Sequence, residues 1–271
     1  MTAFDDATAI TALGGGAHTA VCDPAWDAPR GPNGGYLAAI VLRAMAAELD
    51  DASRPARSIT LHYLRPPHGG ALRVDVVVER SGRTLSTLSA RLTQDDRLCV
   101  MAIAAFAGAF PDAEGAQFSA PMPDVPPAAR VDVLPAHDAA PPIRHRFVMR
   151  HAIGPEPFSS GAEALTGGWI SLHEPQPLDA ATLAFYADAW LPPVFGRLAV
   201  PLAAPTIDLT IHFRDPSAAA RVAPDEPVLG VFRSDYASDG LTESDGELWS
   251  ADGVLLAHSR QLMLLLPWRP A

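Results

Sequence analysis

The chain has 271 residues, of which 48% are hydrophobic, and this is enough to bury a large core in one or two domains. Its net charge is −11 and basic residues form no long runs, so a nucleic-acid partner is not expected. The two cysteines, Cys22 and Cys99, have neither the number nor the spacing of a disulfide framework or a metal site.

The N-terminal segment predicts a cytoplasmic protein. Residues 1–6 are acidic and lack the basic region and the apolar run of a signal peptide. The apolar stretch from Leu37 to Met45 is interrupted by Arg43 and is too short to cross a bilayer. We therefore expect a cytoplasmic location and no membrane span.

The first half of the chain predicts one helix followed by antiparallel strands. Apolar residues at Leu37, Ile40, Val41 and Met45 form one face of a helix over Gly35–Leu49. Residues 58–66 (Ser-Ile-Thr-Leu-His-Tyr-Leu-Arg-Pro) alternate apolar and polar side chains, the pattern of a half-buried strand. Three more strand-like runs follow, at 71–80, 84–93 and 97–106, with turn signals at 81–82 and 95–96.

The middle of the chain differs in composition from both sides. Residues 111–143 are dense in Pro, Ala and Asp, which indicates a linker. Composition does not decide whether this linker is ordered over the surface. We expect an N-terminal unit in residues 1–110 and a C-terminal unit in residues 144–271.

The second half repeats the first. Residues 208–216 (Asp-Leu-Thr-Ile-His-Phe-Arg-Asp-Pro) match residues 58–66 at an offset of 150, with the Thr, the His and the final Pro in common. A helix over 178–190 precedes this strand and ends before Pro192. Strand-like runs follow at 227–233, 241–250 and 254–266, and Asp252-Gly253 signals a hairpin. The repeated order predicts an α+β fold, a tandem hotdog in which two antiparallel sheets each wrap a long helix.

Three motifs resemble those of the type II acyl-CoA thioesterases. They are Asn33-Gly34-Gly35-Tyr36 at the start of the first helix, Thr206-Ile207-Asp208 through His212-Phe213-Arg214, and Asp252-Gly253-Val254 through Gln261. The resemblance covers residues 15–110 and 165–266. It implies a double hotdog whose tandem units pair as a pseudo-dimer into one continuous sheet. It also implies hydrolysis of acyl-CoA thioesters in lipid metabolism, with acyl-CoA as substrate and with no cofactor or metal.

The resemblance further implies a catalytic set in the second unit, consisting of an Asp, a Gln and a Ser or Thr on the strand between them. The Asp falls on Asp208 and the Gln on Gln261. At the hydroxyl position this sequence has Asp235, with Ser234 and Ser238 nearby, so the chain departs from the family pattern there.

The repeat supports the same residues independently. Asp208 corresponds to Ser58, and Gln261 corresponds to Ala105 if six residues are inserted before the last hairpin. A purely structural role should have kept the two copies alike. The difference therefore predicts one active site across the junction of the two units and a dead site at Ser58.

The predicted residues suit thioester hydrolysis. Desolvation raises the pKa of a carboxylate in a cleft and makes it a better base at neutral pH, so Asp208 is expected to activate water. Gln261 and Asp235 are expected to position that water. A glycine-rich helix start offers backbone N–H groups to the oxyanion, and Gly34–Tyr36 is such a start.

Other functions remain open at this point. A non-catalytic hotdog protein that binds acyl-CoA or a lipid-like ligand is the main alternative, and the departure at Asp235 favours it. A hydratase would place a His beside an Asp in the helix region, but Gly35–Leu49 contains no His. The sheet could also serve as an assembly surface, and a homodimer is expected in every case. The acyl chain and the thiol carrier, CoA or a carrier protein, are not determined.

Overall fold

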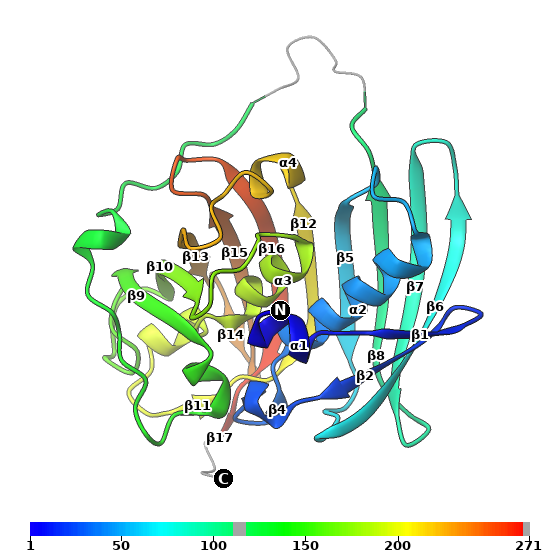
Figure 1. The fold of residues 1–271 in the computed structure, drawn as a ribbon. Helices are drawn as coiled ribbons and strands as arrows, with labels where there is room; N and C mark the ends of the chain where they lie inside the picture. The colour runs from blue at the N-terminus through cyan, green and yellow to red at the C-terminus, as the bar shows by residue number, and fades with distance from the viewer. Residues whose placement is uncertain (111–117, 268–271) are drawn as a thin grey trace.

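The computed structural model describes residues 1–110 and 118–267 (Figure 1), so the first residues of the expected linker lie outside the described residues. The helices are α1 (Ala3–Ala7), α2 (Gly34–Leu49), α3 (Ala180–Ala189) and α4 (Pro216–Ala219), with 3-10 turns η1 (Pro24–Trp26), η2 (Ala128–Arg130), η3 (Pro142–His145) and η4 (Pro193–Gly196). The strands of the first half are β1 (Thr11–Gly14), β2 (Ala17–Cys22), β3 (Asp27–Ala28), β4 (Gly31–Pro32), β5 (Ala56–Tyr63), β6 (Gly70–Ser81), β7 (Leu85–Gln94) and β8 (Arg97–Ala107). Those of the second half are β9 (Phe147–Ile153), β10 (Leu165–Leu172), β11 (Leu202–Ala203), β12 (Thr206–Phe213), β13 (Val228–Arg233), β14 (Ala237–Ser238), β15 (Leu241–Trp249), β16 (Leu255–Leu264) and β17 (Leu266–Pro267).

The order of elements expected from the sequence is confirmed. The six strand-like runs are β6, β7, β8, β13, β15 and β16, and the first helix is α2. The second helix, α3, has only ten residues, because Asp179 caps it by accepting from the Thr182 N–H and Trp190 is already extended. The expectation of a long helix in each half is therefore wrong for the second half.

One continuous sheet joins the two halves. Thirteen strands belong to it, and twelve follow in the order β1-β2-β6-β7-β8-β5-β12-β16-β15-β13-β10-β9, while β14 pairs with β15. The halves meet where β5 pairs antiparallel with β12, and there the hydroxyls of Thr60 and Thr210 lie 3.0 Å apart. The two sheets expected from the fold class thus form a single sheet. Pairing of β5 with β12 covers an edge of each half that would otherwise be exposed.

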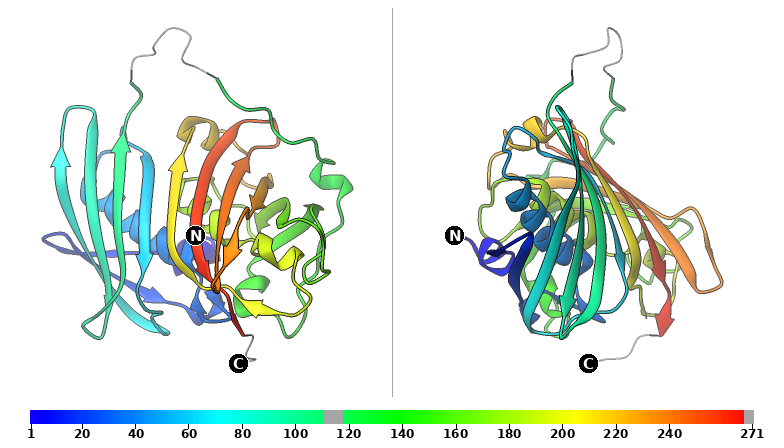
Figure 2. Two further views of the ribbon diagram at one scale, coloured as in Figure 1. Left: turned by 180° about the vertical axis from the view of Figure 1, so that it is seen from behind. Right: turned by 90° about the vertical axis from the view of Figure 1, so that its right-hand side faces the viewer.

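Helices α2 and α3 both lie on one face of this sheet, which curves around them (Figures 1 and 2). We call this face the inner face. It carries the main core, to which α2 contributes nine buried residues. None of the helices in the two described ranges is long and apolar enough to span a bilayer.

The outer face of the sheet is covered in only one half. In the second half, Trp169, Leu229 and Trp249 form a second core with side chains of the segment that precedes β9, namely Met122, Val125, Ala128 and Val131. In the first half, Val77, Met101 and Ile103 remain 54%, 42% and 52% exposed. Part of the segment expected to be a linker therefore packs on the second half.

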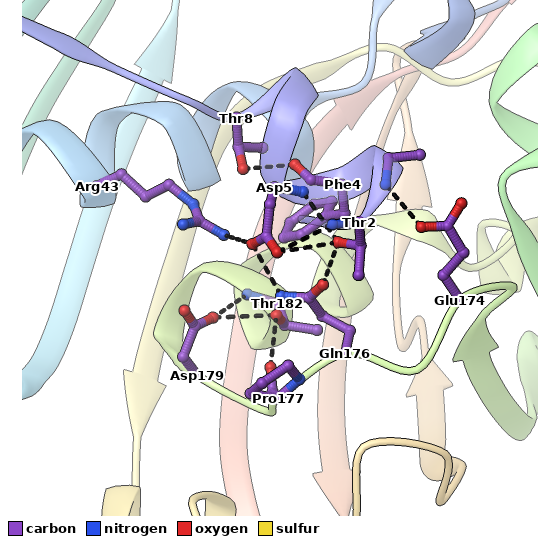
Figure 3. Close-up of polar contacts among 11 residues, drawn as sticks. Thr2, Phe4, Asp5, Thr8, Arg43, Glu174, Gln176, Pro177, Asp179 and Thr182 are labelled. Carbon is purple, nitrogen blue, oxygen red and sulfur yellow. Dashed lines mark hydrogen bonds and ion pairs between the residues drawn. The ribbon is translucent and has the colours of Figure 1, made fainter.

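The short helix α1 connects the two halves (Figure 3). The Asp5 carboxylate accepts from Arg43 of α2 at 2.8 Å and from Gln176, which precedes α3, at 3.0 Å. Phe4 is buried against Trp26 and Phe185, with ring centroids 5.5 Å from each. The N-terminus is thereby fixed over the junction of the two helices.

Candidate active site

The N-terminus of α2 lies against the C-terminal part of α3. Gly35 permits this approach, because a Cβ added there would lie 2.6 Å from the carbonyl oxygen of Ala184 and 2.9 Å from that of Phe185. The first turn of a helix has backbone N–H groups without partners in the helix and a partial positive charge. The crossing brings this charge to Asp188, near the end of α3.

The carboxylate of Asp188 is bound by the start of α2. Its Oδ2 accepts from the Gly35 N–H at 3.0 Å and from Asn33 Nδ2 at 2.8 Å. Asn33 Nδ2 also donates to the main-chain oxygen of Asp188 at 3.0 Å, while Asn33 Oδ1 accepts from the Tyr36 N–H at 2.9 Å. Asn33 therefore fixes both the start of the helix and the carboxylate beside it.

The sheet supplies two more polar groups to this cluster. Thr206 Oγ1 lies 3.3 Å from Asp188 Oδ1 and 2.9 Å from Gln261 Oε1. A hydroxyl has a single hydrogen, which an ionised carboxylate accepts in preference to an amide oxygen. Gln261 satisfies the hydroxyl oxygen if its amide turns to present the NH₂ group. Asp188, Thr206 and Gln261 then form one chain of hydrogen bonds.

A bulge in β12 places Thr206 in the cluster. Thr206 pairs with Met263 and Leu209 with Gln261, so β12 uses one residue more than β16 over this stretch. Residues paired across strands share a face of the sheet, and Leu209 is fully buried, so Gln261 lies on the inner face. The extra residue, Ile207, shifts the alternation and brings Thr206 to the inner face as well.

Asp208 lies on the outer face, because it alternates with the buried Leu209. Asp208 pairs with His62 of β5, which is exposed, and with Leu262 of β16, which neighbours Gln261 but points to the opposite face. The structure thus brings Gln261 to Asp188 and not to Asp208. The catalytic role expected of Asp208 has no support from the polar contacts of the cluster.

Asp235 lies apart from the cluster as well. Its side chain is 72% exposed, lies 3.8 Å from Arg233, and its N–H donates to Glu243. Ser234 contacts the hydroxyl of Thr242 at 2.8 Å, and Ser238 lies in the short strand β14. The hydroxyl that contacts Gln261 is that of Thr206.

Burial raises the pKa of Asp188 to about 6. Hydrogen bonds from the main chain of Gly35 and Gly34, from Thr206 and from Asn33 oppose this rise, because they stabilise the charged form. The carboxylate is therefore largely ionised at neutral pH and yet basic enough to take a proton from water.

Two cavities of the described structure lie apart from this cluster. One of about 200 Å³ lies beside α1 and Trp26, and one of about 420 Å³ lies beside Arg150 and Ser171. Neither is lined by Asp188 or Gln261, so polar contacts and not cavity volume mark the site. Among the described residues, no group of three His, Cys, Asp or Glu side chains is arranged to hold a metal ion.

Comparison with protein families decides the class of this site. The family model described as acyl-CoA thioesterase N-terminal domain matches residues 22–107, and that described as acyl-CoA thioesterase C-terminal domain matches residues 119–265. The chain belongs to the acyl-CoA thioesterase family. It is thus a thioester hydrolase, as the resemblance of its motifs implied. A comparison with curated protein sequences found no match.

Solved structures agree with this family. A conserved hotdog-fold protein of unknown function from Alicyclobacillus acidocaldarius is 30% identical, with a TM-score of 0.90 and 98% of each chain covered. A proposed thioesterase II from Thermobifida fusca is 28% identical, with a TM-score of 0.83 and 98% of each chain covered. An acyl-CoA thioesterase II from Mycobacterium marinum is 20% identical, with a TM-score of 0.76 and 98% of each chain covered, and this likeness shows the hotdog fold alone.

The acyl-CoA thioesterase chain has alanine at the first-half position of each cluster residue. The offset of 150 relates Asp188 to Ala38 and Thr206 to Ala56, which also precedes a bulge. Leu209 pairs with Gln261 as Ile59 pairs with Ala104, so Ala104 is the counterpart of Gln261. The sequence-based alignment with Ala105 is wrong by one residue. All three alanines are buried.

Gly34–Tyr36, expected to bind the oxyanion, lies at the site. The N–H of Gly35 donates to Asp188 and that of Tyr36 to Asn33. The Tyr36 ring is buried, and its hydroxyl oxygen lies 3.0 Å from the backbone carbonyl oxygen of Ala7 and 3.1 Å from that of Val21. Tyr36 thus has a structural role in addition to its position in the helix start.

Asp188 and the role of Thr206 were not predicted from the sequence. One signal for Asp188 was available, since it is the only charged residue in the apolar segment 180–190. A charged residue in such a helix is rarely buried without a partner. Thr206 had no comparable signal, because the bulge that turns it inward cannot be read from the alternation of residues.

Proposed function

We propose that this thioesterase hydrolyses acyl-CoA with a water molecule that Asp188 activates and that Thr206 and Gln261 hold. Asp188 takes the role that the sequence suggested for Asp208. The main support is the position of its carboxylate between the N-terminus of α2 and the Thr206–Gln261 pair. Its pKa of about 6 suits a general base at neutral pH.

The fold is proposed to be a double hotdog that acts as a pseudo-dimer. The support is the common offset of 150 residues, the junction of β5 with β12, and the bulge at equivalent positions of these two strands. In this arrangement the first half supplies the helix N-terminus and the second half supplies the side chains. The single site accordingly lies across the junction.

In the first step, the oxygen of the water attacks the thioester carbonyl carbon while Asp188 accepts a proton from that water. The π electrons of the carbonyl move to its oxygen, which becomes an oxyanion. In the second step, the carbonyl re-forms, the C–S bond breaks, and the CoA thiolate takes the proton from Asp188. The products are one carboxylic acid and one CoA thiol, so atoms and charge balance.

The N-terminus of α2 is proposed to stabilise the oxyanion. The Gly35 amide donates to the Asp188 carboxylate, and the main chain of both Gly34 and Gly35 stabilises its charged form. When Asp188 accepts the proton, its charge is lost as a negative charge forms on the carbonyl oxygen. The same donors can then serve the oxyanion with little rearrangement. A Cβ on Gly34 would lie 3.0 Å from Asp188 Oδ2, so glycine keeps this space free.

The proposal is tested by thiol release from short, medium, long and aromatic acyl-CoAs, with Asp188→Asn compared with Asp208→Asn. We expect Asp188→Asn to lower kcat/KM by roughly a hundredfold or more. Asp208→Asn should stay within about threefold of the wild type, because surface changes away from the site have small effects. Both cysteines are buried, which keeps the background of the thiol assay low.

The reverse ranking of the two variants would restore Asp208 as the base. If no acyl-CoA is hydrolysed but CoA esters raise the melting temperature, the chain is a binding protein. Hydrolysis of acyl groups on a carrier protein but not on CoA would change the proposed substrate. The expected homodimer and cytoplasmic location remain predictions.

A further inference from the structure

The hydroxyl of Tyr63 contacts the peptide group that binds Asp188. Tyr63 lies at the end of β5, and its Oη donates to the carbonyl oxygen of Gly34 at 2.7 Å. The carbonyl of Gly34 and the N–H of Gly35 belong to one planar peptide group. That N–H donates to Asp188 Oδ2 at 3.0 Å. Tyr63 and Asp188 are thus connected through a single peptide.

The ring of Tyr63 and the carboxylate of Asp188 enclose Gly34. A Cβ added to Gly34 would meet Tyr63 Cζ and Asp188 Oδ2, each at 3.0 Å. Burial raises the pKa of Tyr63 well above its usual value, and the charge of Asp188 adds to this rise. The phenol is therefore protonated and able to donate throughout the pH range in which Asp188 titrates.

The repeat separates the role of the ring from that of the hydroxyl. At the offset of 150, Tyr63 corresponds to Phe213, whose ring is 3% exposed and packs in the core. An aromatic ring therefore suffices for packing at this position of the fold. The hydroxyl occurs only in the copy that lies beside Asp188, and Asp188 itself has Ala38 as its counterpart.

We propose that Tyr63 is a positioning residue of the thioesterase site, whose hydroxyl holds the Gly34–Gly35 peptide so that its N–H stays on the Asp188 carboxylate. A donor on the carbonyl polarises the peptide and strengthens its N–H as a donor. Other neighbours of the carboxylate are the uncharged Asn33 and Thr206, and Tyr63 is the titratable group that faces it. The inference rests on the proposed role of Asp188 as the base.

The test is the pH dependence of kcat/KM for Tyr63→Phe, with the acyl-CoA of the panel that turns over fastest. The apparent pKa of the acid limb should rise by roughly half a unit, because loss of one neutral hydrogen bond weakens the Gly35 N–H as a donor to the charged carboxylate. On the alkaline plateau kcat should fall roughly tenfold, as expected for a misplaced catalytic group, while KM should change less than twofold.

Tyr186→Phe is the matched control. Tyr186 also has a buried ring, and its hydroxyl accepts from the Leu172 N–H without contact to the site. This variant should lose thermal stability but keep the acid limb of the wild type. If Tyr63→Phe behaves in the same way, the inference is overturned and the Tyr63 hydroxyl is purely structural.

Replacement of Tyr63 by 3-fluorotyrosine keeps the test open if Tyr63→Phe does not fold. The fluorinated phenol is a stronger donor, so the acid limb should move downward, and an unchanged limb would contradict the inference. The outcome for Asp188→Asn separates the two proposals. If Asp188→Asn is inactive and the Tyr63 variants leave the limb unchanged, only the role of Tyr63 fails.

Discussion

The two halves of the molecule share one plan but differ where chemistry is expected. Asp188, Thr206 and Gln261 of the second half have Ala38, Ala56 and Ala104 as counterparts. The helices differ too, because α3 begins at Ala180, one turn before the position equivalent to the start of α2.

That extra turn changes what each helix can bind. The N–H of Ala184, the counterpart of Gly34, lies inside α3 and is used by the helix itself. Gly35, in contrast, can donate to a side chain. Buried alanines therefore suffice for packing at these three positions in the first half. In the second half, polar residues occupy the same positions, and there the free N-terminus of α2 faces them.

The largest expected effect comes from giving the second half the residues of the first. The triple variant Asp188→Ala, Thr206→Ala and Gln261→Ala should lower kcat/KM by about 10²–10⁴-fold. Because the three groups act as one unit, kcat/KM of the triple variant should be within a few-fold of that of Asp188→Ala alone. Thiol-release kinetics of the single and triple variants measure this. Additive losses would show that the residues act separately.

The converse change should destabilise the first half. Ala38→Asp places a carboxylate at a fully buried position, and the counterpart of the free start of α2 lies inside α3, where the amides bond within the helix. The cost should be about 3 kcal/mol or more, which lowers the Tm by at least about 5 °C. Ala47→Asp, on the exposed side of α2, is the control and should change the Tm little. A well-tolerated Ala38→Asp would mean that free donors exist on that side.

The raised pKa of Asp188 predicts two pH dependences. A base must be ionised, so kcat/KM of the wild type should rise with pH, reach half of its maximum near pH 6 and level off above about pH 7. A carboxyl with a raised pKa stabilises the fold when protonated, and this contribution is lost as the pH rises through about 6.

Asp188→Asn removes that loss. Its Tm relative to wild type should therefore be higher at pH 8 than at pH 4, by a few degrees. Thermal melts of both proteins across this range measure the effect. An equal difference at both pH values would show that burial does not control the ionisation of Asp188.

The smallest effect concerns the contact of α1 with both halves. Hydrogen bonds from Gln176, Thr2 and Arg43 lower the pKa of Asp5, although burial opposes them. Asp5→Ala should lower the Tm by about 2 °C at neutral pH, as expected for one partly exposed network. The difference in Tm should shrink in acid, because a carboxylate with a lowered pKa stabilises the fold only at pH values at which it is ionised. Asp6→Ala, exposed on the same helix, should have no measurable effect.

The repeat, the order of elements and the family can all be predicted from the amino-acid sequence. Alternating strands, the helical face of α2 and the offset of 150 are patterns of residue spacing along the chain, so they can be recognised without the structure. Gln261 and the Gly34–Gly35 start of α2 were also identified, because they belong to motifs that the family shares.

Whether Asp188 or Asp208 lies beside Gln261 and the start of α2 depends on the three-dimensional packing. Asp208 points outward because it alternates with the buried Leu209, and the bulge at Ile207 breaks this alternation, so Thr206 faces inward. Asp188 reaches the cluster because α2 and α3, one from each half of the chain, cross at Gly35. Strand faces shift with one extra residue, and contacts between helices depend on how they pack. Neither is fixed by the spacing of residues along the chain.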